Sequence, residues 1–75
     1  MSYLIFDHSK LRGKIREVVG SEQDFCKLMN LSPTTMTLKL NGKRKFTQLE
    51  MKNAISILEI DPKEISEYFF KLKVR

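Results

Sequence analysis

The sequence predicts an all-α domain with a helix-turn-helix at its centre, because two helix-start signals lie close together. Ser21 and Ser32 are eleven positions apart, and each hydroxyl can accept a hydrogen bond from a free N–H of a first helical turn. Pro33 follows at the first helical position, where its missing N–H is not needed. This spacing leaves room for two helices of about two to three turns, which are the dimensions of a helix-turn-helix.

Each of these two helices also has a predicted end and an apolar face. Asn30 can take the left-handed conformation that ends the first, and Asn41-Gly42 can end the second. Residues at helical spacing are expected to face inward, and they are Phe25, Cys26 and Met29 in one helix and Met36 and Leu40 in the other.

Three further helices are predicted around this motif, which gives a compact five-helix fold. Residues 7–19 form the first, with Asp7 or Ser9 as its cap and Gly20 at its end. Its apolar stripe is Leu11, Ile15, Val18 and Val19. A capping box at residues 47–50 begins the fourth helix, and residues 61–64 begin the fifth in a similar way. Their inward residues are Met51, Ala54, Ile55, Leu58, Ile65, Tyr68 and Phe69.

The C-terminal residues 70–75 alternate apolar and basic side chains, which is typical of a short β-strand half buried on one face. Residues 3–6 or a second subunit are the two expected partners of this strand. Because an open strand edge can pair with another chain, its apolar side chains are the candidate dimer contacts, namely Phe70, Leu72 and Val74. The alternative is that they close the core over Tyr3 and Phe6.

Length and composition predict a single domain over residues 1–75. The chain is 41% hydrophobic and 31% charged, as in ordinary soluble domains, and has no repeat or linker. Its longest apolar run, residues 3–6, is far shorter than the ~20 residues of a membrane span, and no secretory signal is present. We therefore expect a cytoplasmic protein without a membrane partner.

Positive charge is concentrated around the predicted helix-turn-helix. Fourteen Lys and Arg against nine Asp and Glu give a net charge of +5, which favours polyanionic partners. No acidic residue occurs in residues 25–49, whereas a second basic group precedes the motif at Lys10, Arg12, Lys14 and Arg16. A charge run alone is often only a solvated face, but here it coincides with the motif, which favours DNA binding.

Catalysis is not expected from this sequence. His8 and Cys26 lie in different predicted helices, and no phosphate-binding loop, metal-ligand cluster or nucleophile-base pair can be assembled. His8 is expected to be a surface residue, and Cys26 a small buried apolar one. The prediction is therefore a protein that is not an enzyme, with no cofactor, no metal and no small-molecule ligand.

Four segments carry a resemblance to a known family: FDHSKLRGKI at residues 6–15, SEQDFCKLMNLS at 21–32, TTMTLKLNGK at 34–43 and EISEYFFKLKV at 64–74. The chain resembles the lambda-repressor-like helix-turn-helix family, and within it the Cro-type repressors of temperate phages of Gram-positive bacteria. The resemblance implies a sequence-specific transcriptional repressor in the bacterial host cell. It would bind double-stranded operator DNA as a two-fold homodimer, with the recognition helix in the major groove.

The resemblance and the side-chain chemistry assign the expected DNA contacts. Base-reading positions on the recognition helix are Pro33, Thr34, Thr35, Thr37 and Leu38, whose hydroxyl and methyl groups suit base edges. Expected phosphate contacts are Ser21, Gln23, Lys39, Asn41, Lys43, Arg44 and Lys45. For Lys39, the stem is expected to lie on the core while the ammonium reaches outward.

Two departures from the family pattern leave a second hypothesis open. Glu22 stands where the family has a phosphate-contacting Gln, and Phe46 stands where it often has Pro. A carboxylate cannot serve as a phosphate contact. The alternative function is therefore a protein-interaction antirepressor, which would bind another regulator through residues 70–74 rather than DNA.

Overall fold

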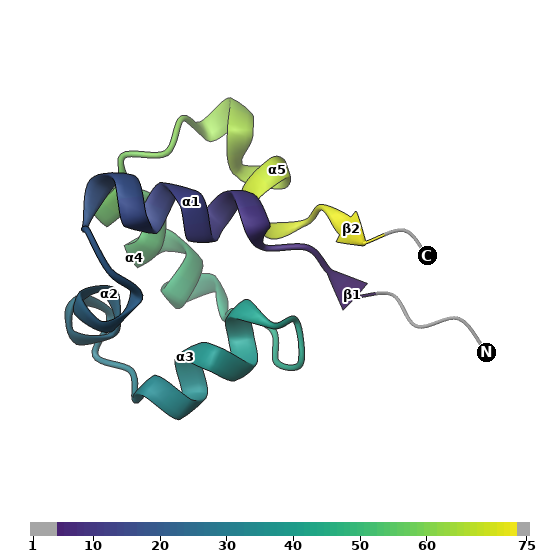
Figure 1. Ribbon diagram of the computed structural model, residues 1–75. Coiled ribbons are helices and arrows are strands. Elements are labelled where there is room, and N and C mark those ends of the chain that lie inside the picture. The colour runs from purple at the N-terminus through teal and green to yellow at the C-terminus, as the bar shows by residue number, and fades with distance from the viewer. Residues whose placement is uncertain (1–4, 74–75) are drawn as a thin grey trace.

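In the computed structural model, which describes residues 5–73, five α-helices begin close to where the sequence predicts them (Figure 1). The helices are α1 (Ser9–Val18), α2 (Glu22–Met29), α3 (Pro33–Leu40), α4 (Gln48–Leu58) and α5 (Ile65–Phe69). A 3-10 turn, η1 (Pro62–Glu64), leads directly into α5. Two short strands, β1 (Ile5–Phe6) and β2 (Leu72–Lys73), flank the helices. The predicted five-helix, all-α fold is confirmed.

Side-chain caps start the three central helices at the predicted residues. Ser21 Oγ accepts from the N–H of Asp24, and Ser32 Oγ accepts from that of Thr35. Thr47 and Glu50 complete the capping box of α4. Such caps each contribute about 1 kcal/mol by satisfying backbone donors that have no partner within the helix.

Left-handed residues end the helices that flank the turn, largely as predicted. Asn30 has φ 58° at the end of α2. After α3 the positive φ, 78°, falls on Gly42 rather than on Asn41. The predicted stop is therefore made by the second residue of the pair, where the missing side chain removes the steric cost.

The core draws apolar side chains from all five helices and from two loops. Its buried members are Leu11, Ile15, Phe25, Cys26, Met29, Met36, Leu40, Phe46, Ala54, Leu58, Ile60, Tyr68 and Phe69. Burial raises the pKa of the Cys26 thiol, with Glu22 adding to the effect, so the side chain stays a neutral apolar group as predicted. The predicted stripe of α1 is wrong at Val18, which is 40% exposed, whereas Leu11 and Ile15 are buried and Val19 packs against the core as predicted.

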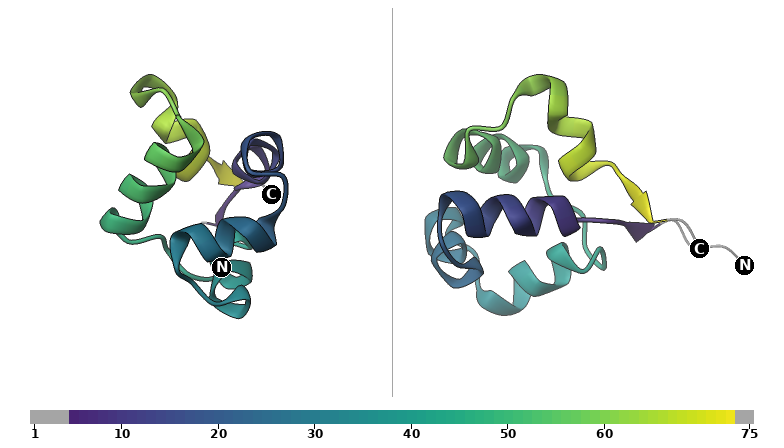
Figure 2. Two further views of the ribbon diagram at one scale, coloured as in Figure 1. Left: turned by 90° about the vertical axis from the view of Figure 1, so that its left-hand side faces the viewer. Right: turned by 45° about the horizontal axis from the view of Figure 1, so that its top comes forward.

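The chain ends pair with each other. β1 and β2 are antiparallel, with Ile5 opposite Lys73 and Phe6 opposite Leu72, and the N–H of Asp7 donates to the carbonyl of Lys71. Of the two expected strand partners, the structure thus contains the one in the same chain. The ribbon projects from the end of the molecule where α1 begins and α5 ends, beside the loop between α3 and α4 (Figures 1 and 2).

An ion pair between the buried Lys39 and the half-buried Glu50 joins the end of α3 to the start of α4. The ammonium of Lys39 lies 2.6 Å from Glu50 Oε1 and donates at 3.0 Å to the carbonyl of Lys45. The same Glu50 oxygen accepts from the N–H of Thr47 at 2.9 Å. Burial would raise the pKa of Glu50, but the hydrogen bonds from Lys39 and Thr47 and the nearby positive charge outweigh it and hold that pKa below its ordinary value of 4.5.

His8 is a core residue, so its prediction as a surface side chain is wrong. It is only 4% exposed, and its Nδ1 lies 3.1 Å from the carbonyl oxygen of Tyr68. Its ring also packs edge-on against Phe46, with centroids 5.4 Å apart. Burial lowers the pKa of His8 more than the Tyr68 hydrogen bond and Asp7 raise it, so the neutral ring is favoured.

Breaking the Lys39–Glu50 ion pair is expected to destabilise the fold strongly. Glu50→Gln should cost about 3 kcal/mol, because it leaves a buried ammonium without its counter-charge. The double variant Lys39→Met, Glu50→Gln removes both charges and should recover most of that loss. Urea unfolding at neutral pH measures both variants. Equal stability of Glu50→Gln and the parent would contradict a structural role for the pair.

The buried imidazole should make stability depend on pH. Below the ordinary His pKa of 6.5 the unfolded chain takes up a proton that the folded chain excludes, so stability falls until the pH passes the lowered pKa of His8. His8→Gln keeps a donor for the Tyr68 carbonyl but does not titrate. Thermal unfolding between pH 7.5 and 5.5 should show a smaller decline for this variant, and parallel profiles would rule out the assignment.

Candidate interaction surface

The outer face of α3 is neutral. Pro33, Thr34 and Thr37 are exposed, Leu38 is half-buried, and these four side chains line a shallow open depression. Thr35 is also half-buried, and its hydroxyl accepts from Ser32 Oγ at 2.9 Å. All five predicted base-reading residues therefore belong to one helix, but they are not equally accessible. The face offers hydroxyl and methyl groups, which suit base edges or a protein surface.

Three exposed cations follow α3 in a loop that is tied to the helix. Lys43, Arg44 and Lys45 are all exposed. The N–H groups of Lys43 and Arg44 donate to the carbonyl of Leu38, at 2.9 and 3.2 Å. These bonds hold the loop backbone against the last turn of α3, and the three positive side chains are exposed there.

The expectation that the Lys39 ammonium reaches outward is wrong. The side chain is buried, with the residue only 6% exposed, and its ammonium bonds to Glu50 and to the Lys45 carbonyl. The cation also lies 5.8 Å from the centroid of the Phe46 ring. An ammonium in this setting gains more from a carboxylate and a carbonyl than from water, so it is not available to a phosphate.

A carboxylate occupies the start of α2, where the family resemblance places a phosphate contact. Glu22 Oε2 lies 3.5 Å from Arg12 Nη1 and 3.7 Å from Arg16 Nη2. Arg12 also donates to Asn41 Oδ1 at 2.6 Å. The sequence marked both arginines as a basic group, but their one-turn spacing on α1 was the available signal that they share a partner.

Some of the remaining predicted phosphate contacts bond to other residues of the fold, and others are exposed without such a bond. The hydroxyl of Ser21 is used to cap α2, whereas Gln23 is exposed. Asn41 is exposed, but its side-chain oxygen is held by Arg12. Four predicted phosphate contacts make no side-chain hydrogen bond or ion pair within residues 5–73. They are Gln23, Lys43, Arg44 and Lys45.

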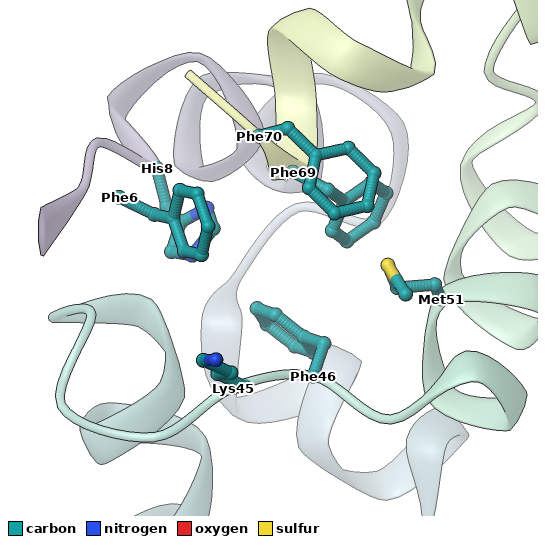
Figure 3. Close-up of a pocket in the computed structure, with 7 residues that line it drawn as sticks. All are labelled: Phe6, His8, Lys45, Phe46, Met51, Phe69 and Phe70. Atoms are coloured by element: carbon teal, nitrogen blue, oxygen red, sulfur yellow. The ribbon is translucent and has the colours of Figure 1, made fainter. Parts of the chain in front are cut away.

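One predicted dimer contact, Phe70, lines an aromatic pocket that the sequence analysis missed. Phe70 is 50% exposed and packs edge-on against Phe6, with centroids 6.1 Å apart. The backbone of Leu72 pairs with Phe6, and Val74 lies outside the described residues. The pocket, shown in Figure 3, encloses about 150 Å³ and is lined by Phe6, His8, Lys45, Phe46, Met51, Phe69 and Phe70.

Residues 5–73 hold no group of three or more His, Cys, Asp or Glu side chains placed to bind a metal ion. No helix within these residues has the length and apolar character that crossing a membrane requires.

Comparisons with known proteins show a family and a similar solved structure. The family described as "Protein of unknown function (DUF739)" matches residues 3–72. The chain is also similar to the solution structure of the modulator of repression (MOR) of the temperate bacteriophage TP901-1 from Lactococcus lactis, with 41% identity and a TM-score of 0.76. That similarity covers 93% of this chain and 95% of the other. No curated protein matches. The chain therefore belongs to the DUF739 family.

Proposed function

We propose that this protein is a phage regulator that modulates repression by binding another regulator, a repressor protein, rather than by reading an operator itself. The observation that carries the proposal is the Glu22 carboxylate at the start of α2, paired with Arg12 and Arg16. The similarity of the chain to a phage modulator of repression supports a role in repression.

The position of Glu22 opposes phosphate binding in two ways. The first turn of a helix attracts anions, because its N–H groups are free and the helix dipole is positive there. Here that site already carries a carboxylate, which repels a phosphate. The same carboxylate also neutralises two arginines that would otherwise strengthen the field towards DNA.

Two further predicted phosphate contacts have partners within the fold. Lys39 is buried against Glu50, and the Asn41 amide oxygen is held by Arg12. The α3 face itself is uncharged and partly apolar at Pro33 and Leu38. A neutral face bordered by a few cations is the ordinary composition of a protein interface, which has an apolar centre and a charged rim.

A Cro-type DNA-binding repressor is the second candidate, and a specific observation favours it. Residues 25–49 contain no acid, and Lys43, Arg44 and Lys45 project beside α3. In this candidate the predicted base-reading residues enter the major groove of an operator bound by two subunits. The two candidates differ in what the start of α2 does.

Glu22→Gln separates them, because it installs the residue type of the DNA-binding family. We expect the parent chain to bind labelled duplexes only weakly and without sequence preference, and the variant to bind about tenfold more tightly at low salt, as expected for a gain of about 1.4 kcal/mol. Fluorescence anisotropy at 50 and 200 mM salt measures both. Glu17→Gln removes an exposed acid of α1 without touching either arginine, and is the matched control.

The same preparation should be tested for a protein complex. The parent chain should co-elute with a purified repressor from the same phage in size-exclusion chromatography, with no DNA present. Tight, sequence-selective binding of the parent to an operator duplex, with no such complex, would overturn the proposal and leave the DNA-binding candidate.

Arg44→Ala provides a check on the second candidate. If the protein reads DNA, this variant should weaken all duplexes equally and flatten the slope of log affinity against log salt by about one unit. Thr37→Ala and Leu38→Ala should instead change which bases are preferred. A change of base preference caused by Arg44→Ala would contradict the assignment of this residue to the backbone.

A further inference from the structure

We propose that the aromatic pocket of Figure 3 receives one aromatic side chain bearing a hydrogen-bond donor, a Tyr or a Trp, carried on an acidic segment of the partner regulator. The partner identity rests on the proposed function above. No residue of α3 lines the pocket; its lining comes from β1, from the loop that leads into α4, from α4 itself and from the end of α5.

The size of the pocket fits one aromatic side chain. Its volume of about 150 Å³ is below the ~300 Å³ at which pockets for drug-sized ligands begin. An apolar cavity of about 150 Å³ is large enough to bind benzene. A side chain delivered by a protein partner therefore fits better than a free cofactor or metabolite.

The walls of the pocket are suited to aromatic contacts. Phe46 stands edge-on to both His8 and Phe69, with centroids 5.4 and 5.5 Å apart, and Figure 3 shows these rings around an open centre. A ring entering there can stack on faces and edges at once, an arrangement that favours aromatic over aliphatic side chains. Phe70 and Met51, which are not fully buried, lie at its border.

His8 adds a polar preference to this lining. A carbonyl oxygen can only accept, so the Nδ1 atom facing Tyr68 carries the proton. The other ring nitrogen, Nε2, then keeps a lone pair and acts as an acceptor in the neutral ring. A phenol O–H or an indole N–H can donate to it, whereas a phenyl ring cannot.

Charge at the border indicates an acidic partner. Lys45 lines the pocket, and no acid is among its described lining residues. Lys43 and Arg44 precede it in the same exposed loop, and within residues 5–73 none of these three cations makes an ion pair. A second copy of this chain, with its own net charge of +5, would be repelled, whereas carboxylates flanking the inserted ring would be attracted.

Peptide probes test the pocket on the full-length, isotope-labelled protein by NMR titration. The probes are capped five-residue peptides: an acidic one with a central Tyr, the same with Phe or Ala at the centre, and a basic one with Tyr. The acidic Tyr peptide should shift the resonances of Phe46, Met51 and Phe70. It should bind more tightly than the Phe peptide, and at least about tenfold more tightly than the Ala or the basic peptide.

Two variants keep the test specific. Phe70→Ala removes an exposed wall of the pocket and should weaken the acidic Tyr peptide by about tenfold. Leu28→Ala truncates another exposed apolar side chain, 57% exposed on α2 and not part of the pocket lining, and should leave the affinity unchanged. Equal binding of the Ala peptide, or shifts confined to α3, would overturn the proposal.

The outcomes also separate this inference from the proposed function. Peptide binding at the pocket without any complex with a repressor would contradict the proposed function but support an aromatic-binding pocket. A repressor complex that neither Phe70→Ala nor the peptide affects would contradict the pocket alone. Self-association of the chain that Phe70→Ala abolishes would identify a second copy as the occupant and overturn the acidic partner.

Discussion

The arrangement of the interaction surface depends on one contact, the ion pair between Lys39 and Glu50. It fixes the end of α3 relative to the start of α4, because Glu50 simultaneously holds Lys39 and the backbone of Thr47. Lys39 in turn holds the carbonyl of Lys45. The loop between the two helices is therefore anchored at both ends, and its three exposed cations are held between the α3 face and the aromatic pocket.

A second polar cluster reduces the net positive charge where α1 lies against the start of α2. Arg12 and Arg16 share the Glu22 carboxylate, and Arg12 also reaches Asn41 at the exit of α3. These bonds link α1, α2 and the end of α3. The basic surface suggested by the sequence is thereby reduced, because Arg12, Arg16 and Lys39 form ion pairs within the fold.

Interactions between residues that are close in the sequence were predicted correctly, whereas those between residues far apart in the sequence were missed. The caps at Ser21, Ser32 and Thr47 were predictable, because a cap involves residues three positions apart. The core faces of α2 and α3 followed from helical periodicity. His8 was misassigned because its partner, Tyr68, is sixty positions away. The pocket was missed for the same reason, since its rings come from segments that only the tertiary fold brings together.

The two candidate functions exclude each other, because both need the positive charges of the loop that follows α3. A partner whose ring enters the pocket would place its carboxylates near Lys45 and its neighbours Lys43 and Arg44. A duplex on α3 would need the same three cations for its phosphates, since Lys39, Arg12 and Arg16 are paired internally. These three cations cannot neutralise the carboxylates of the partner and the phosphates of DNA at the same time. An acidic protein partner and DNA would therefore compete for this loop even though the pocket and the α3 face are separate surfaces.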